Sequence, residues 1–289
     1  MTTRSTSQKI IFDTDIGDDI DDAYALALLL KSPEVKILGI TTAFGDTHLR
    51  ARLVSRLLQV TGASAVPVFE GPKTTVAKGL TQANWALQSP DRPYPDAIAF
   101  TLGMIRKYPG QITLISVAPL TNIGALIAKD PATFRKLKRV VLMGGSINRG
   151  YGNAAHPDPE WNILNDIAAS KALFASGVPL YVMPLDSTQI LLDKSRRESI
   201  YARSSPLTGA LRELTGEWTA GTGYDTPTLF DAVATAYALD PELCPMTPMR
   251  IEIDDKGFTR KVEGAVNANV CLSSNDKSFF DFYIPMVTQ

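Results

Sequence analysis

This chain of 289 residues has few cysteines and histidines, and its net charge is close to zero. Its two cysteines, Cys244 and Cys271, are too few for the disulfide framework of a small secreted domain, so we expect reduced thiols in a cytoplasmic protein. The formal net charge of −1 supplies no basic field, which argues against nucleic acid and membrane surfaces as partners. The longest apolar run, residues 23–30, is too short to cross a bilayer, and the polar residues 1–9 lack the apolar segment of a signal peptide.

Predicted strands and helices alternate over the first two thirds of the chain. Short β-rich segments occur at residues 9–12, 36–42, 66–69, 112–117, 140–143 and 180–184. Patterns typical of helices separate them at residues 22–30, 47–60, 97–107, 122–129 and 167–175. Several of the strands are apolar at consecutive positions, which is typical of strands buried on both faces. The alternation predicts an α/β fold with an open, mainly parallel, Rossmann-like sheet flanked by helices.

The end of the chain has a different pattern. Residues 250–253 and 261–271 are predicted strands with no helix between them, which indicates a small antiparallel appendix at the C-terminus. No linker rich in glycine or serine, no repeat and no low-complexity segment divides the sequence. We therefore expect a single domain over residues 1–289.

One short segment concentrates acidic residues. Residues 13–22 read Asp-Thr-Asp-Ile-Gly-Asp-Asp-Ile-Asp-Asp, so six of ten positions carry a carboxylate. The segment follows the first predicted strand, and ligands of open α/β sheets bind beyond the carboxyl ends of their strands. A single carboxylate, such as Asp21 or Asp22, would suffice to cap the helix that follows. Six together need a cation or raised pKa values, and carboxylate oxygens suit a hard divalent ion.

The acidic segment resembles the N-terminal signature of the inosine–uridine preferring nucleoside hydrolase family, Asp-x-Asp-Pro-Gly-x-Asp-Asp-Ala. Blocks similar to the family's further motifs follow in the same order at residues 41–46, 117–126, 143–162, 185–188 and 230–231, and they include Pro-Leu-Thr-Asn-Ile, Met-Gly-Gly and Glu-Trp-Asn. The resemblance covers residues 9–240. It implies a homodimeric or homotetrameric enzyme of nucleoside salvage that uses Ca²⁺ to hydrolyse ribonucleosides to ribose and free base.

The resemblance also implies roles for individual residues. Asp15 matches the carboxylate that binds calcium and acts as general base toward the attacking water. The implied metal ligands are Asp15, Asp22, the backbone carbonyl of Val117, and Asp231. The implied substrate-binding residues are Asp21, Asp46, Asn153, Glu160 and Asn162. Such groups suit the chemistry, because carboxylates stabilise a transition state that resembles an oxocarbenium ion, and carboxylate or amide groups can hydrogen-bond ribose hydroxyls.

The sequence departs from the family's pattern at three places. The acidic loop is two residues longer, so Asp18 and Asp19 are additional carboxylates, and either could replace Asp22 as a ligand. Phe230 stands where well-known members carry a histidine that is thought to protonate the leaving base. Asp46 stands where many members have asparagine.

These departures leave the preferred nucleobase and the leaving-group acid open. His156 lies in the predicted site loop, where we expect an exposed side chain. Tyr224 is an alternative proton donor, and Trp218 could stack on a base. We expect Asp13 to support the acidic loop through hydrogen bonds, and Thr121 and Asn122 to cap the helix that follows Pro119.

Other functions compete with the nucleoside hydrolase. The same fold could belong to a non-catalytic protein that binds a ribosyl ligand or calcium, or to a hydrolase of a non-standard ribosyl substrate. A phosphoryl-transfer enzyme with Asp13 as nucleophile and magnesium as metal is disfavoured, because it gives no role to Glu160 and Asn162.

Overall fold

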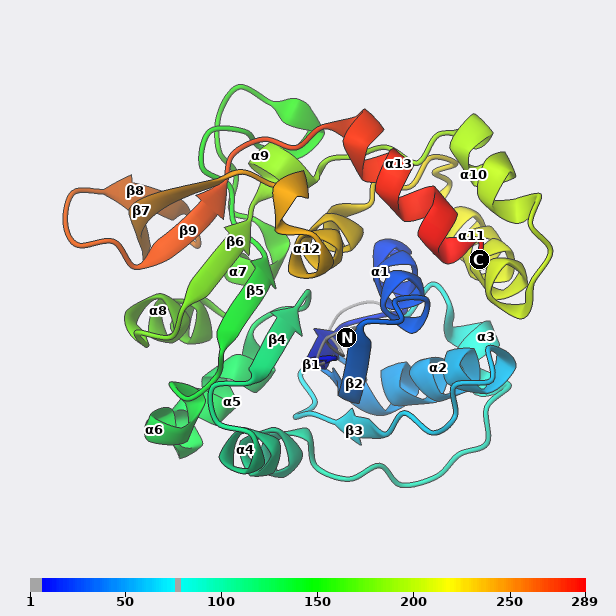
Figure 1. Ribbon diagram of the computed structural model, residues 1–289, viewed down its shortest axis with the longest axis horizontal. Coiled ribbons are helices and arrows are strands. Elements are labelled where there is room, and N and C mark those ends of the chain that lie inside the picture. Colours follow the sequence, from blue (N-terminus) through cyan, green and yellow to red (C-terminus); the bar gives the residue numbers. More distant parts are fainter. Residues whose placement is uncertain (1–6, 76–78) are drawn as a thin grey trace, which may run out of the picture.

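The predicted α/β architecture is confirmed in the computed structural model, which describes residues 7–75 and 79–289 (Figure 1). A nine-stranded sheet has the order β3-β2-β1-β4-β5-β6-β9-β7-β8. The strands are β1 (Gln8–Thr14), β2 (Val35–Thr42), β3 (Val68–Glu70), β4 (Ile112–Ser116), β5 (Arg139–Met143), β6 (Leu180–Met183), β7 (Met246–Ile253), β8 (Thr259–Val262) and β9 (Ala268–Cys271). From β3 to β9 all neighbours pair in parallel.

The strand order reverses direction at β1. The chain passes from β1 outward to β2 and β3, and then returns to place β4 on the other side of β1. Such a switch point leaves a crevice beyond the carboxyl ends of the two central strands. The acidic segment therefore begins at the position in this sheet where a ligand is most easily accommodated.

The antiparallel group at the C-terminus differs from the expected one in its number of strands. Residues 261–271, expected as one strand, form the end of β8, a turn through Gly264 at φ 135°, and β9. A positive φ of this size is available to glycine without steric cost, so the chain can reverse there. β9 pairs in parallel with β6 and antiparallel with β7, and it thereby joins the appendix to the main sheet.

Helices cover both faces of the sheet. One hydrophobic core lies under α1 (Asp21–Leu30), α2 (Thr47–Val60), α10 (Lys194–Tyr201), α11 (Pro206–Thr222), α12 (Phe230–Leu239) and α13 (Asp276–Val287), and the other lies under α4 (Ala97–Lys107), α5 (Thr121–Lys129) and α8 (Ile167–Ala175). The two groups lie on opposite sides of the sheet in Figure 1. Shorter helices are α3 (Ala83–Leu87), α6 (Pro131–Phe134), α7 (Trp161–Leu164), α9 (Leu185–Thr188), η1 (Tyr151–Asn153) and η2 (Pro241–Leu243).

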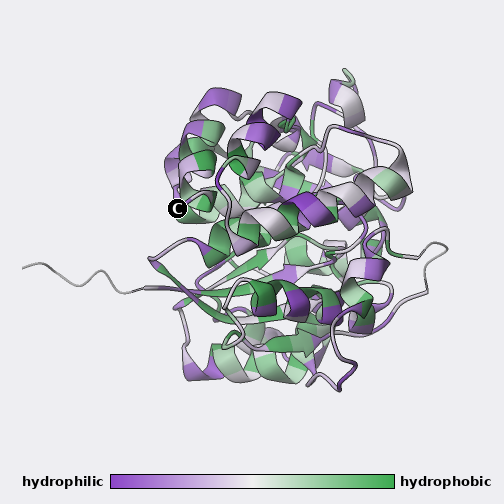
Figure 2. Ribbon diagram, turned by 90° about the vertical axis from the view of Figure 1, so that its right-hand side faces the viewer, coloured by the Kyte–Doolittle hydropathy of each residue, from purple (hydrophilic) through white to green (hydrophobic). Residues whose placement is uncertain are grey.

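Helix α1 lies in the interior of the protein. Its sequence after the two aspartates, Ala-Tyr-Ala-Leu-Ala-Leu-Leu-Leu, is apolar on every side, and such helices are buried by neighbours all round. Figure 2 shows the hydrophobic colour concentrated in the middle of the molecule, with more hydrophilic colour on the outer helices. The acidic loop is thus attached to one of the best-packed elements of the fold.

The expectation of reduced cysteines is wrong. Cys244 and Cys271 form a disulfide with a Cα–Cα distance of 5.7 Å, which ties the segment after α12 to the end of β9. In the described part of the chain, none of the helices combines the length and apolar character needed to cross a membrane.

Candidate active site

Strand β1 ends in the acidic loop. It delivers Asp13 and Asp15 to the carboxyl edge of the sheet, and the chain then turns at Gly17, whose φ is 126°. Helix α1 begins at Asp21 and Asp22, so these carboxylates lie at the positive end of its dipole. The side chains of Asp13, Asp15, Asp21 and Asp22 are all buried, although each would be hydrated in an unfolded chain.

Asp13 anchors the start of the acidic loop through hydrogen bonds. Its carboxylate accepts bonds from Thr41 Oγ1 at 2.6 Å, Asn122 Nδ2 at 2.6 Å and Ser116 Oγ at 3.4 Å. Burial raises the pKa of Asp13 to about 6, although these three bonds oppose the shift. The carboxylate thereby links β1 to β2, β4 and α5 beneath the site.

Asn122 does not cap its helix, contrary to our expectation. The N-cap of α5 is Leu120, and that cap makes no side-chain hydrogen bond. Asn122 instead donates to Asp13 and, at 3.2 Å, to the carbonyl of Thr42. A local sequence pattern cannot distinguish these two uses of asparagine, because the alternative partners come from distant strands.

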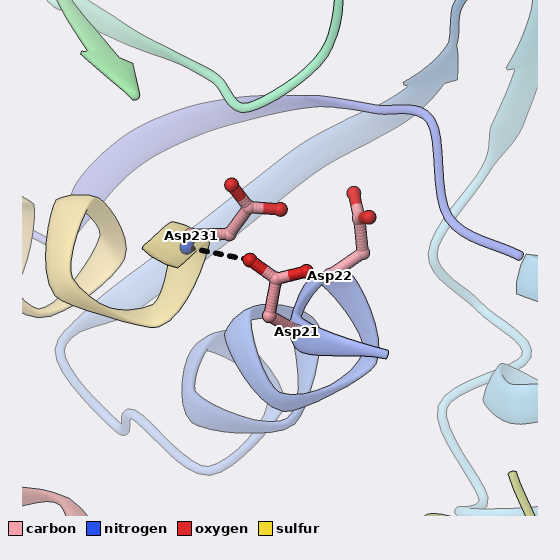
Figure 3. Close-up of side chains that lie close together, drawn as sticks. All are labelled: Asp21, Asp22 and Asp231. Carbon is pink, nitrogen blue, oxygen red and sulfur yellow. Dashed lines mark hydrogen bonds between the residues drawn. The ribbon is translucent and has the colours of Figure 1, made fainter. Parts of the chain in front are cut away.

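Three carboxylates from the first turns of two helices lie close together (Figure 3). Ligand oxygens of Asp21, Asp22 and Asp231 all lie within 4.8 Å of one another, and all three side chains are buried. Asp231 is at the start of α12, and its backbone N–H donates to Asp21 Oδ2 at 3.0 Å. Thr14 Oγ1 donates to Asp22 and orients the third carboxylate.

The electrostatics of this cluster favour a bound cation. Burial is the largest cause that raises the pKa of Asp15, Asp21 and Asp231 well above the usual range, and neighbouring aspartates raise these pKa values further. Burial also raises the pKa of Asp22 to about 7. A cation among these oxygens would favour their charged forms and offset the cost of burial.

The donor set fits a hard divalent ion. Oxygens on opposite sides of Ca²⁺, each about 2.3–2.6 Å from it, are about 5 Å apart, and the three carboxylates fall within that span. The cluster contains Asp22 and Asp231 of the predicted ligand set, together with Asp21, which was expected at the sugar. Asp15 lies close enough for its charge to raise the pKa of Asp21 and Asp231. Val117 follows β4, and its N–H donates to the Asp13 carbonyl at 2.9 Å, so its peptide is held beside the loop.

The two additional carboxylates take different positions. Asp18 Oδ2 accepts a bond of 3.0 Å from Arg50, a buried arginine of α2 that the sequence did not single out. Asp19 Oδ1 accepts from the N–H of Ile20 at 2.7 Å. Neither belongs to the three-carboxylate cluster.

Besides Asp21, four residues were predicted to bind the sugar. Glu160 and Asn162 are buried, and Asp46 and Asn153 are exposed. Glu160 accepts from the N–H groups of Asn162, Ile163 and Gly145 at 2.9–3.2 Å, and burial raises its pKa to about 7. Asn162 donates from Nδ2 to the Met143 carbonyl at 3.1 Å. Both residues therefore stand fixed at the carboxyl end of β5.

The exposed pair lies at the surface around the site. Asp46 caps α2 by accepting from the Leu49 N–H at 3.2 Å. Asn153 has a φ of 60°, and its N–H donates to Gln189 Oε1 at 3.1 Å.

Two aromatic side chains pack together beside Asp231. The ring of Phe230 packs edge-on against Tyr151, with centroids 6.3 Å apart. Tyr151 was missed in the sequence, where only its place two residues before Asn153 could have indicated it. Its hydroxyl accepts from the Trp161 N–H at 2.9 Å, and burial, with the nearby charge of Glu160, raises its pKa.

The other residues named in the sequence as possible contacts of the nucleobase differ in exposure. Trp218 is buried, and its ring centroid lies 6.5 Å from that of Tyr224, whose side chain is exposed. His156 is exposed as expected, and its Nδ1 is 3.6 Å from Asp158 Oδ1.

Comparison with known proteins decides the family. Residues 10–281 match the family described as inosine-uridine preferring nucleoside hydrolase. The chain belongs to this family. RihB of Escherichia coli O9:H4, a pyrimidine-specific ribonucleoside hydrolase, is 30% identical over 272 residues, which are 86% of this chain and 83% of RihB. Uridine nucleosidase 1 of Arabidopsis thaliana is 32% identical over 196 residues, and the match covers 63% of this chain and 57% of that longer protein.

Solved structures show the same fold. The plant nucleoside hydrolase PpNRh1 superposes with a TM-score of 0.85 at 23% identity, over 97% of this chain and 99% of the other. Membership of the nucleoside hydrolase family identifies the protein as an N-ribosyl hydrolase, and it supports cleavage of the N-glycosidic bond of ribonucleosides. The cluster of Asp21, Asp22 and Asp231 is a candidate metal site in this metal-dependent family.

Proposed function

We propose that this protein is a calcium-dependent ribonucleoside hydrolase in which Asp15 is the general base. The observation that carries the proposal is the buried cluster of Asp21, Asp22 and Asp231 at the sheet's switch point, with Asp15 beside it. The ion would be held by the carboxylates of Asp15, Asp22 and Asp231 and by the carbonyl of Val117. When bound, Ca²⁺ supplies a positive charge that orients water and makes it more acidic.

The chain's own groups account for the bond changes. Asp15 takes a proton from a water molecule, whose oxygen then bonds to C1′ of the ribose. The N-glycosidic bond breaks, and its electron pair leaves with the base, which acquires a proton. The buried carboxylates stabilise the positive charge that develops on the sugar in the transition state.

The buried polar residues at the end of β5 would bind the ribose. Glu160 already accepts three backbone N–H groups, so its carboxylate is rigidly placed and retains capacity for one more bond. Asp21 and Asn162 complete the buried set, and Asp46 and Asn153 would contact the sugar from the outer edge. A site that fixes hydroxyl partners in this way discriminates against a deoxyribose, because its polar groups would then lack a partner.

Residue 230 bears on the choice of nucleobase. Phe230 cannot donate a proton, so leaving-group assistance must come from solvent or from another residue such as Tyr224, with Trp218 available for stacking. The curated relatives are named for pyrimidine ribonucleosides and uridine. Uridine is therefore the first substrate to test, and inosine is the purine comparison.

The test is the release of free ribose from a panel of purine and pyrimidine ribonucleosides and from a chromogenic riboside with a good leaving group. We expect release from at least one natural nucleoside, and loss of that release when calcium is removed by a chelator. Release from the chromogenic riboside alone would show that the sugar site works without a leaving-group acid for the tested bases. No release from any compound by calcium-loaded protein would overturn the proposal in favour of a ligand-binding role.

We also propose that the protein forms homodimers or homotetramers, as its family resemblance implies. Light scattering coupled to size-exclusion chromatography would show a mass of two or four times 31.3 kDa. The cytoplasmic location stays a prediction, and the disulfide removes the cysteine-based part of its support.

A further inference from the structure

Arg50 is a fully buried cation beside the acidic loop. It comes from the first turns of α2, and its side chain is 0% exposed. Its guanidinium donates from Nε to the Phe44 carbonyl at 2.8 Å, from Nη1 to the carbonyls of Asp15 and Ile16, and from Nη2 to Asp18 Oδ2 at 3.0 Å. Burial of a guanidinium is expensive unless it is paired and hydrogen-bonded, and every nitrogen of Arg50 makes at least one such contact.

These contacts bear directly on Asp15. The Asp15 peptide carbonyl is one of the acceptors of Arg50. The carbonyl carbon and Cβ of Asp15 are both bonded to its Cα, so hydrogen bonds that hold this carbonyl limit rotation about the Cα–C bond and fix the point on the backbone from which the Asp15 side chain projects. The next carbonyl, that of Ile16, is held at 3.1 Å by the same nitrogen, so two consecutive peptides are fixed.

Residues 17–19 of the acidic loop are also hydrogen-bonded to the segment before α3. Thr81 Oγ1 donates to the Asp18 carbonyl at 2.5 Å, and Gln82 donates from its backbone to Gly17 at 3.0 Å and from Nε2 to Asp19 at 2.9 Å. The loop is therefore not a flexible insertion. Its acidic side chain at Asp18 is directed to the arginine, and its peptides are hydrogen-bonded to the segment before α3.

We propose that Arg50 is a positioning residue for Asp15, and that Asp18 is the counter-ion of Arg50 and not a metal ligand. The inference rests on the proposed function, since it assigns Asp15 to catalysis and calcium to the neighbouring carboxylates. It accounts for an additional carboxylate in the loop without adding a further negative charge to the metal cluster.

Arg50→Met, Arg50→Lys and Asp18→Asn test the proposal. For Arg50→Met we expect kcat to fall about 10- to 100-fold with KM changed less than about threefold, because the base is misplaced while the sugar site is intact. Arg50→Lys should recover part of the loss, because an ammonium group can reach some of the same acceptors but lacks the fork geometry. Asp18→Asn should leave the calcium Kd, measured by titration calorimetry, within about threefold of the wild type.

Arg139→Met is the matched control. Arg139 is a partly buried arginine that also donates to a backbone carbonyl, that of Ala238 at 2.9 Å, but it lies at the start of β5 and at the opposite edge of the sheet. It should leave kcat unchanged. If Arg50→Met does not fold, as judged by circular dichroism, Arg50→Lys and Asp18→Asn still decide the matter.

The outcomes separate this inference from the proposed function. Wild-type protein that releases no ribose and binds no calcium would overturn the proposed function. Wild-type protein that does both, with full kcat in Arg50→Met, or in Arg50→Lys where Arg50→Met does not fold, would overturn the positioning role alone. A calcium Kd raised more than about tenfold by Asp18→Asn would instead make Asp18 a metal ligand.

Discussion

The backbone N–H of Asp231 donates a 3.0 Å hydrogen bond to Asp21 Oδ2, although the two residues are 210 positions apart in the sequence. The bond joins the first turn of α12 to the first turn of α1, so the N-termini of both helices face one group of carboxylates (Figure 3). Two helix dipoles and one N–H group favour negative charge there, but they are too weak to compensate several buried carboxylates. The remaining charge is what a divalent cation would neutralise.

Removal of calcium should destabilise the protein. A ligand that binds only the folded state at about 100 times its Kd adds about 2.7 kcal/mol of stability, which for a chain of this size corresponds to a Tm increase of about 4–5 °C. We expect chelation to lower the Tm by that amount and added calcium to restore it, as measured by differential scanning fluorimetry. An unchanged Tm, with no heat of binding in a calcium titration, would contradict a calcium site.

The stability of the chelated protein should fall as the pH rises. A carboxyl whose pKa is raised binds its proton more tightly in the folded state than in the unfolded state, so its contribution is present at low pH and is lost as the pH passes through the raised pKa. The pKa of Asp13 is raised from 3.8 to about 6, and that of Glu160 from 4.5 to about 7. Stability should therefore be lost between about pH 4 and about pH 7. The shift of Asp13 alone corresponds to a loss of about 3 kcal/mol in the free energy of unfolding across this range.

Urea titrations of chelated protein at several pH values measure this slope. The free energy of unfolding should decrease between about pH 4 and about pH 7, and saturating calcium should reduce or reverse the decrease, because the ion binds the ionised carboxylates. A free energy of unfolding that rises with pH in the chelated protein would show that these carboxylates are not held in their protonated forms.

Asn122 should contribute to stability through Asp13 and not through a helix cap. Asn122→Ala removes the donor to Asp13 and to the Thr42 carbonyl, and leaving buried acceptors without a donor costs about 1–3 kcal/mol. Thr121→Val, one residue earlier in the same turn, is the control, since the Thr121 hydroxyl is buried without a partner among the described residues. Equal destabilisation by both substitutions in urea unfolding would contradict the assignment.

The fold could be predicted from the sequence wherever the signal is local. The bounds of α2, α4 and α8 are those expected, because amphipathic or apolar periodicity and a preceding aspartate define each helix. Helix α11 was not expected, since its glycines at 209, 216 and 221 weaken the helical pattern. It is stabilised by a capping box at Ser205 and by burial of Leu211, Leu214 and Trp218.

The site could be predicted only in part, for a physical reason. The clustered carboxylates of residues 13–22 signal a charged site by themselves, but the approach of Asp231 depends on the packing of α12 against α1. In sequence Arg50 resembles Arg52 and Arg56 of the same helix, which are only partly buried, and the tertiary structure alone buries Arg50 completely. The pairing of Cys244 with Cys271 likewise depends on the place of β9 beside β6 and β7.

The most direct test of the account is kcat for ribose release by Asp15→Asn, with calcium binding measured on the same sample. The amide keeps an oxygen toward the ion but cannot take a proton from water, so we predict retained calcium binding and a kcat lower by about 10²–10⁴-fold. Asp193→Asn, the same change at the exposed cap of α10, should leave kcat unchanged. An Asp15→Asn variant that binds calcium and retains kcat within about threefold of the wild type would contradict Asp15 as the base, because loss of a general base costs far more.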